Sequence, residues 1–313
     1  MTAKDLFDYE PPEITWVWDN MLSTGGTALL VSRAKVGKTQ LILGLSLAIS
    51  KGIDFLGRET NKGKVLILLF EGHIRDIRKR LFDMGLEPDN DNVIVRIAPT
   101  PRLKEFETVH EWFEKTVNDI KPSLVIIDTL FTMFPGSLQL VNDYQIISLL
   151  MPLENVARKT DTCILVTHHQ KKSLTNDIDS VLGSTGLSAS VDHIIGYQNT
   201  QSDNRELKSL GIREGEGIKE PIIVQLNDNG FPLNAGNSSE YKYQKIWKLI
   251  IEAIENSDDE RLQAGILRKV SAQRKDINST ITRYVNSGDL IKEQEGNSVF
   301  YKLRDISESP WGS

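Results

Sequence analysis

The chain has 313 residues and a formal net charge of −6, so it is long enough for one large domain and a second small one. Hydrophobic residues make up 39% and charged residues 26%, as in an ordinary soluble globular protein, and the acidic balance argues against a protein that coats nucleic acid with its whole surface. No apolar run approaches the roughly 18 residues needed to cross a bilayer, and the start, MTAKDLFDYEPPE, has no basic-then-apolar signal segment, so we expect a cytoplasmic protein without membrane contact.

The first 25 residues are expected to form an extended segment that packs on the edge of the first domain. Pro11 and Pro12 favour extended backbone, and two large apolar side chains, Trp16 and Trp18, follow them. We therefore begin the first domain itself at residue 26.

A phosphate-binding loop is predicted at residues 32–39, between the apolar run 28–31 and a helical pattern that continues from Leu41. The pattern Gly-x4-Gly-Lys-Ser/Thr wraps backbone N–H groups around phosphates, and its lysine and hydroxyl reach the β- and γ-phosphates and Mg²⁺. Ser32 replaces the first glycine, which a small residue can do if the turn does not require positive φ. The predicted ATP-binding residues are Ser32, Arg33, Ala34, Lys35, Val36, Gly37, Lys38, Thr39 and Gln40.

The rest of the first domain, residues 26–235, is predicted to be an α/β fold. From residue 28 to about 198, unbroken apolar runs alternate with helical stretches, which indicates a mostly parallel sheet covered on both faces. Cys163 lies inside one of these runs, so we expect a buried, inert side chain, and a single cysteine excludes a disulfide framework. Residues 206–213 and 221–226 are predicted to pair as a C-terminal β-hairpin extension.

Two acidic residues directly follow apolar strands. Asp128 ends the run 123–127, where P-loop NTPases place the aspartate that orients Mg²⁺ and its water; an aspartate that only caps the next turn is the alternative. Glu71 ends the preceding strand, where a carboxylate can face the γ-phosphate and accept a proton from the attacking water. We predict Mg²⁺ at Thr39 and, through water, at Asp128, with Lys38 and Glu71 as catalytic residues.

A second domain is predicted at residues 241–304, after a linker at 236–240 and before a flexible tail at 305–313. Apolar stripes indicate three helices, and a β-hairpin follows them, an arrangement that resembles a winged helix. Its third helix would present groups suited to phosphates and base edges, whereas a winged helix that binds protein is the alternative. The predicted DNA-binding residues of this helix are Arg274, Lys275, Asn278, Ser279, Thr282 and Arg283.

The ordered motifs in residues 12–233 resemble those of the RecA-like ATPases, most closely the branch of the RepA-type hexameric replicative helicases of plasmids and phages. The motifs are the phosphate loop, Glu71, LVIIDTL, LVTHHQKKS and GSTGLSASVDHIIG. The resemblance implies a RecA-like P-loop NTPase core with a C-terminal β-hairpin extension, hydrolysis of ATP with Mg²⁺ as cofactor, and assembly into a ring.

The resemblance also implies how the nucleotide is coupled to DNA. One of His168 and His169 would sense the γ-phosphate and transmit its presence to a DNA-facing loop that contains Lys171 and Lys172. Leu182 departs from this pattern, because many relatives have a basic residue there, and the departure weakens the expected DNA contact through that loop.

A residue that acts between subunits is implied as well. Arg213 ends a strand of the hairpin that projects towards the neighbouring subunit in RecA-like rings, and it would reach the neighbour's γ-phosphate in trans. Lys208 is the rival for this role. Such a shared site implies a homo-oligomer, and a hexamer is the expected ring.

Three functions remain open on the sequence. The first is an ATP-driven DNA helicase or translocase of a mobile element or phage, with single-stranded DNA in the ring channel and duplex contacts through the winged helix. The second is a DNA-bound ATPase switch or loader that unwinds nothing, and the third is a nucleotide-binding transcriptional regulator. All three require the same nucleotide pocket, so the sequence alone does not separate them.

Overall fold

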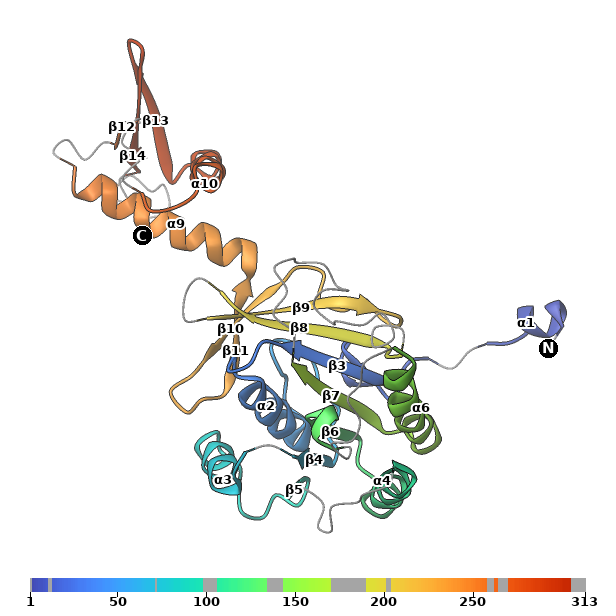
Figure 1. Ribbon diagram of the computed structural model, residues 1–313. Coiled ribbons are helices and arrows are strands. Elements are labelled where there is room, and N and C mark those ends of the chain that lie inside the picture. Colours follow the sequence, from blue (N-terminus) through green and yellow to red (C-terminus); the bar gives the residue numbers. More distant parts are fainter. Residues whose placement is uncertain are drawn as a thin grey trace, which may run out of the picture. The chain divides into compact units, whose positions relative to one another are not determined.

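The chain divides into two compact units, Met1–Ala235 and Gly236–Ser313, and each is described by itself (Figure 1). The structure, a computed structural model, describes residues 2–10, 13–70, 72–97, 106–133, 143–169, 190–200, 204–257, 262–263 and 270–304. No helix in these ranges is long and apolar enough to cross a membrane.

A large, mostly parallel sheet forms the centre of the larger unit, as predicted. Its strands are β3 (Thr27–Ser32), β4 (Val65–Leu69), β5 (Val93–Ile97), β6 (Leu124–Asp128), β7 (Cys163–His169), β8 (His193–Asn199), β9 (Arg205–Ile212), β10 (Ile222–Leu226) and β11 (Pro232–Asn237). The order among described strands is β11-β10-β9-β8-β3-β7-β6-β4-β5. The strands from β8 to β5 are parallel, whereas β9 is antiparallel to both β8 and β10.

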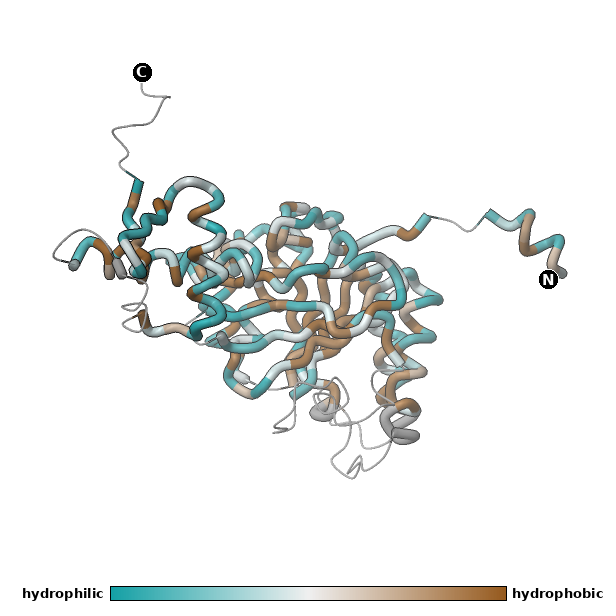
Figure 2. The backbone as a smooth tube through the Cα atoms, turned by 90° about the horizontal axis from the view of Figure 1, so that it is seen from above, coloured by the Kyte–Doolittle hydropathy of each residue, from teal (hydrophilic) through white to brown (hydrophobic). Residues whose placement is uncertain are grey.

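Helices cover both faces of this sheet (Figure 1). On one face lie α2 (Lys38–Lys51) and α3 (Ile74–Asp83), and on the other lie α4 (Phe106–Ile120), α5 (Leu130–Met133) and α6 (Asp143–Thr160). Because successive strand side chains point to opposite faces, Leu30 packs in the α2 layer while Leu29 packs in the α4 and α6 layer. The hydrophobic segments of the larger unit gather in the strands of the central sheet (Figure 2). Cys163 is among the buried residues, as expected, and burial raises the pKa of its thiol.

The N-terminal segment only partly matches the expectation of a packed, extended stretch. Residues 16–23 form a hairpin, β1 (Trp16–Trp18) and β2 (Leu22–Ser23), and Trp18 is buried, with its Nε1 donating to the Phe55 carbonyl at 3.1 Å. Residues 2–10 instead contain a short helix, α1 (Ala3–Phe7), that buries no side chain. The prediction is wrong for these residues because Thr2 and Asp5 form a capping box that stabilises a local helix.

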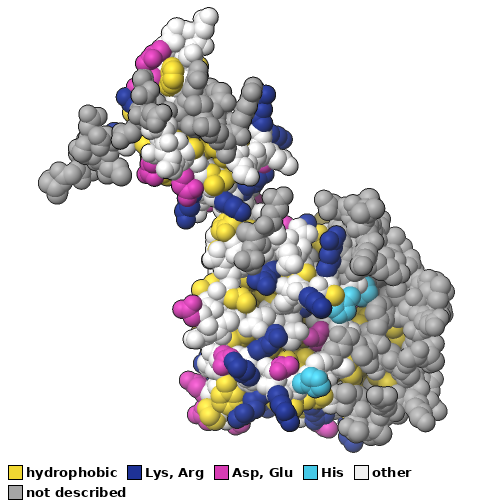
Figure 3. Space-filling view, turned by 60° about the vertical axis from the view of Figure 1, so that its left-hand side comes forward, with side chains coloured by type: hydrophobic (Ala, Val, Ile, Leu, Met, Phe, Trp, Pro, Cys, Tyr) yellow, Lys and Arg dark blue, Asp and Glu magenta, His cyan; other side chains and the backbone are white. Residues whose placement is uncertain are grey.

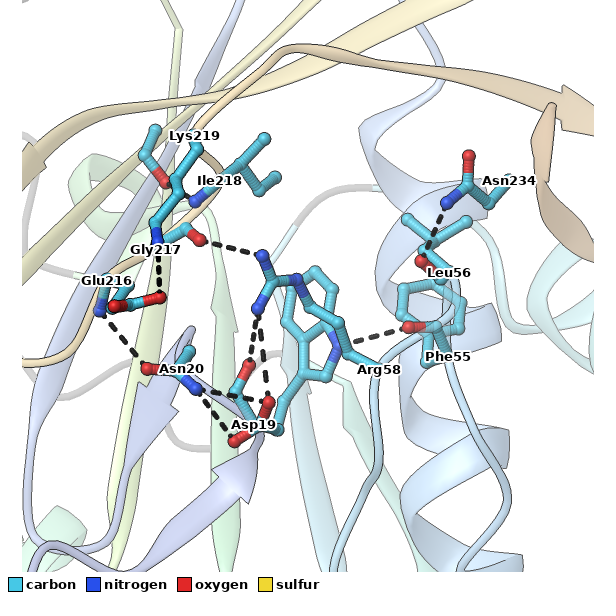
Figure 4. Close-up of polar contacts among 12 residues, drawn as sticks. Asp19, Asn20, Phe55, Leu56, Arg58, Glu216, Gly217, Ile218, Lys219 and Asn234 are labelled. Atoms are coloured by element: carbon cyan, nitrogen blue, oxygen red, sulfur yellow. Dashed lines mark hydrogen bonds and ion pairs between the residues drawn. The ribbon is translucent and has the colours of Figure 1, made fainter. Parts of the chain in front are cut away.

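A polar network ties the β1–β2 hairpin to the turn between β9 and β10 (Figure 4). Arg58 donates to the Asp19 carbonyl at 3.3 Å and to the Gly217 carbonyl at 2.7 Å. The Asn20 side chain accepts a hydrogen bond from the Glu216 backbone N–H at 3.1 Å. This network lies at the amino ends of the parallel strands, because β9 runs back from their carboxyl ends.

The smaller unit has helices and a three-stranded antiparallel sheet among its described residues. Its elements are α9 (Ser238–Glu255), β12 (Leu262–Gln263), α10 (Arg274–Ser287), β13 (Leu290–Glu295) and β14 (Ser298–Leu303), and the strand order is β12-β14-β13. Buried isoleucines of α9 and α10, among them Ile250 and Ile277, form its core. Most of the predicted middle helix, residues 264–269, lies outside the described residues, as does the predicted tail at 305–313.

The prediction of a linker at 236–240 is wrong, because these residues belong to a strand and a helix. The first two residues end β11 and the last three begin α9. Asn237 caps the helix, since its side-chain oxygen accepts from the Glu240 backbone N–H at 2.6 Å. Small polar residues therefore make a strand end and a helix cap here, and the chain passes between the elements without an irregular loop.

Candidate nucleotide-binding site

The phosphate loop connects the end of β3 to the start of α2 at the carboxyl edge of the sheet. Gly37, the residue before α2, has φ 103°, and Lys35 has φ 64°, so the loop turns through left-handed backbone at two positions. Ser32 is the last residue of β3 and does not have positive φ, so the glycine of the usual pattern is not needed there. Its hydroxyl donates to the Arg33 carbonyl at 2.8 Å.

Lys38 is buried at the first position of α2, and its ammonium group contacts side chains of β3 and β7. Its Nζ donates to Ser32 Oγ at 3.1 Å and lies 2.9 Å from His169 Nδ1, which accepts because an ammonium can only donate. β3 and β7 pair so that Ser32 is opposite His169 and Val31 is opposite His168. Of the two predicted histidines, the strand alternation therefore brings His169 to the lysine, whereas His168 is buried on the other side.

Asp128 lies within reach of Thr39, as the metal-site prediction requires. Thr39 Oγ1 donates to Asp128 Oδ2 at 3.4 Å, and the carboxylate is almost fully buried. Its second oxygen, Oδ1, accepts from Thr167 Oγ1 at 2.6 Å, which fixes the orientation of the carboxylate. Thr167 was not predicted. Ile127 of β6 pairs with Val166 of β7, so the residues that follow them, Asp128 and Thr167, are neighbours, and this strand register is the signal for Thr167.

The predicted general base, Glu71, lies outside the described residues. Phe70 directly follows the neighbouring strand β4, and its N–H donates to the Asp128 carbonyl at 2.8 Å. The role of Glu71 as the base stays a prediction.

A cation that the sequence analysis missed lies against the phosphate loop. Arg205, the first residue of β9, donates through Nε to the Val36 carbonyl at 3.1 Å. Arg213 follows the last residue of the same strand, at the opposite edge of the sheet, 3.8 Å from Asp192 Oδ1. Because β9 runs antiparallel to β8, its first residue, Arg205, lies beside the phosphate loop of the same subunit. A role of Arg213 across a subunit interface stays a prediction.

Gln40, which follows Thr39, connects the start of α2 to two other elements. Gln40 donates through Nε2 to the Gly230 carbonyl at 2.6 Å, in the turn between β10 and β11. Its Oε1 accepts from Arg80 of α3 at 3.2 Å. The N-terminal end of α2 is therefore fixed by contacts with two other parts of the fold.

These groups fit a nucleoside triphosphate with Mg²⁺. The loop ends at a helix N-terminus, whose N–H groups bind anions, and Lys38 adds a positive charge beside Ser32 and His169. Thr39 and Asp128 supply a hydroxyl and a carboxylate oxygen, which are the hard ligands that Mg²⁺ prefers. Arg33 and Lys35 are exposed on the outside of the loop.

The predicted DNA-binding residues fall in two places. Lys171, Lys172 and Leu182 lie outside the described residues. On α10, Arg274 and Lys275 are exposed at the first turn, whereas the hydroxyls of the predicted Ser279 and Thr282 donate to carbonyls of their own helix. The guanidinium of Arg283 forms an ion pair with Glu240.

Comparisons with known proteins agree with this site. The family model described as AAA domain matches residues 1–174, which include the phosphate loop, Asp128 and His169. Among solved structures, a KaiC-like protein from the hyperthermophilic archaeon Pyrococcus horikoshii OT3 is similar in fold, with a TM-score of 0.51, 14% identity, and coverage of 72% of this chain and 100% of that chain. No curated protein matches the chain.

Proposed function

Because the chain belongs to the AAA domain family of P-loop ATPases, we propose that it uses ATP hydrolysis to move along DNA. In this proposal it is a hexameric helicase or translocase that acts in the replication of a mobile element or phage. ATP and Mg²⁺ bind at the phosphate loop, and single-stranded DNA passes through the ring.

The contact between Lys38 and His169 is the observation that carries this proposal. The ammonium group lies 2.9 Å from His169 Nδ1, so a γ-phosphate that draws the ammonium towards itself changes the partner of the imidazole. His169 is the last residue of β7, and the lysines expected to face DNA, Lys171 and Lys172, follow it in the chain. Nucleotide state is thereby linked to the backbone that leads to the DNA-contacting residues.

The distribution of positive charge supports a polyanionic partner despite the net charge of −6. On the side of the larger unit that Figure 3 brings forward, Lys and Arg side chains are spread over the surface. Four exposed ones belong to α3: Arg75, Arg78, Lys79 and Arg80. In the smaller unit, the exposed Arg274 and Lys275 begin α10.

Measurement of ATP hydrolysis with and without single-stranded DNA tests the proposal. We expect DNA to stimulate hydrolysis, since a translocating ATPase couples ATP turnover to movement along DNA. Lys38→Ala should remove both basal and stimulated hydrolysis, while Lys51→Ala, at the far end of α2, should retain both. Equal rates with and without DNA contradict a motor, and sequence-specific duplex binding with negligible hydrolysis favours the transcriptional regulator.

A further inference from the structure

A shallow, open groove of about 600 Å³ lies along α9 and α10 in the smaller unit. The side chains that line it are an aromatic ring, a guanidinium, amides and hydroxyls, with no carboxylate and no aliphatic side chain among them. They are Tyr243, Asn278, Ser279, Thr282, Arg283 and Asn286. This composition differs from that of the core beneath it, which is built from isoleucine, valine and leucine.

Among the described residues that line the groove, Arg283 is the only charged one, and its present partners show which contacts an incoming ligand would replace. Its guanidinium lies over the Tyr243 ring, 5.0 Å from the ring centroid. It also donates to the carboxylate of Glu240, in an ion pair whose side chains are 46% and 33% exposed. A half-exposed pair of this kind is worth little in water, so an external anion can replace the carboxylate.

We propose that this groove binds single-stranded DNA and that Glu240 occupies the place of a DNA phosphate when DNA is absent. A phosphate pairs with Arg283 in place of Glu240, and a base stacks against the surface formed by Tyr243 and the guanidinium. The amides of Asn278 and Asn286 lie on the same wall and offer hydrogen bonds to base edges. The inference rests on the proposed action on DNA and adds a site and a strand type to it.

The recess favours an unpaired strand over a duplex. Bases in a duplex are stacked on each other and present only their edges, so the Tyr243 ring cannot stack on them. Tyr243 lies partly buried beneath Arg283, and it is reached by a base that leaves its stack. Stacking of this kind tolerates any base, which suits a protein that moves along a strand.

Glu240 lies where its carboxylate can compete with a DNA phosphate for Arg283. It lies in the first turn of α9, and its backbone N–H is bonded by the Asn237 cap at 2.6 Å. Its carboxylate pairs directly with Arg283, beside the residues that line the groove. Removal of this carboxylate should strengthen DNA binding, whereas a purely structural ion pair predicts no gain.

The first test measures binding of a labelled oligothymidylate to the full chain by fluorescence anisotropy. We expect Glu240→Gln to bind about threefold to fivefold more tightly, the scale of one exposed ion pair that no longer competes. Glu252→Gln is the matched control, because it removes one charge from the same helix about 18 Å further along its axis. At that separation the charge is screened, and the affinity should stay at the wild-type value.

The second test addresses the ring. Tyr243→Ala should weaken binding about tenfold, and Tyr243→Phe should retain it, because stacking needs the ring and not the hydroxyl. Equal affinities of Glu240→Gln and Glu252→Gln would overturn the inference, as would equal loss in Tyr243→Ala and Tyr243→Phe or tighter binding of a duplex than of the single strand. If DNA still stimulates ATP hydrolysis when these variants bind like the wild type, the groove alone is refuted and the proposed function stands.

Discussion

At the scale of single residues, the orientation of Asp128 depends on Thr167. The hydroxyl of Thr167 donates to one carboxylate oxygen at 2.6 Å and leaves the other facing Thr39. Thr167→Val keeps the shape of the side chain and removes this bond to a charged group, so we expect kcat to fall about tenfold. Steady-state ATP hydrolysis measures the change.

The control for this prediction lies directly before the first residue of the same strand. Thr162 is equally buried and donates to the Pro122 carbonyl at 2.9 Å, far from the phosphate loop. Thr162→Val should lower stability and leave kcat unchanged. A similar kcat in both variants would mean that Thr167 does not orient the metal-site carboxylate.

A second residue-scale prediction concerns pH and His193. Burial, with a smaller effect of the Arg58 cation, lowers its pKa from 6.5 to about 4. The unfolded chain therefore binds a proton near pH 6.5 that the folded chain binds only near pH 4, so the free energy of unfolding falls as the pH falls between these values. The loss amounts to about 3 kcal/mol at most.

Chemical denaturation at pH 7 and at pH 4.5 measures this effect. His193→Asn should reduce the difference between the two pH values, because the titrating group is gone. His73→Asn, a change at an exposed histidine, should retain the wild-type difference. The same pH dependence in His193→Asn and the wild type would contradict the assignment.

At the scale of elements, β9 supports the phosphate loop through its first residue. Arg205 donates to the Val36 carbonyl, so Arg205→Ala should loosen the loop and weaken ADP binding about tenfold, the scale of a charge-assisted hydrogen bond. Arg213→Ala changes the other end of the strand and should leave ADP affinity unchanged. Calorimetric titration with ADP separates them, and unchanged affinity in Arg205→Ala would sink the positioning role.

The same elements show which parts of the site could be predicted from the sequence. Strand, loop and helix around residues 28–45 were predictable because their signals are adjacent in the chain. The contacts of Lys38 with His169 and of Arg205 with Val36 depend instead on strand order and register between segments 131 and 169 residues apart. Sequence spacing does not determine these, so His169 could not be separated from His168, and Arg205 was missed.

The wrong predictions for residues 2–10 and 236–240 have a local cause. Pro11 and Pro12 led to the expectation of an extended chain at residues 2–10, and the small polar residues at 236–240 led to the expectation of a linker. Thr2 and Asn237 instead act as helix caps, so the same polarity that excludes these stretches from a core starts a helix. Capping is a property of a single hydroxyl or amide, and composition over a window does not reveal it.

At the scale of the whole molecule, a shared active site would require an assembly. We predict that Arg213 completes the neighbour's site, so subunits with Arg213→Ala and subunits with Lys38→Ala each lack a different half. Each variant alone should be inactive, and a mixture should regain ATP hydrolysis at interfaces that combine an intact loop with an intact arginine. A mixture that stays inactive while labelled subunits demonstrably exchange would remove Arg213 from the site.

The central claim is that ATP hydrolysis at the phosphate loop drives movement on DNA, and strand displacement from a forked duplex tests it most directly. With ATP and Mg²⁺, the wild-type chain should release the labelled strand, while Lys38→Ala under the same conditions should release none. DNA-stimulated hydrolysis by the wild type without any strand release would contradict the helicase and leave an ATPase switch or loader in its place.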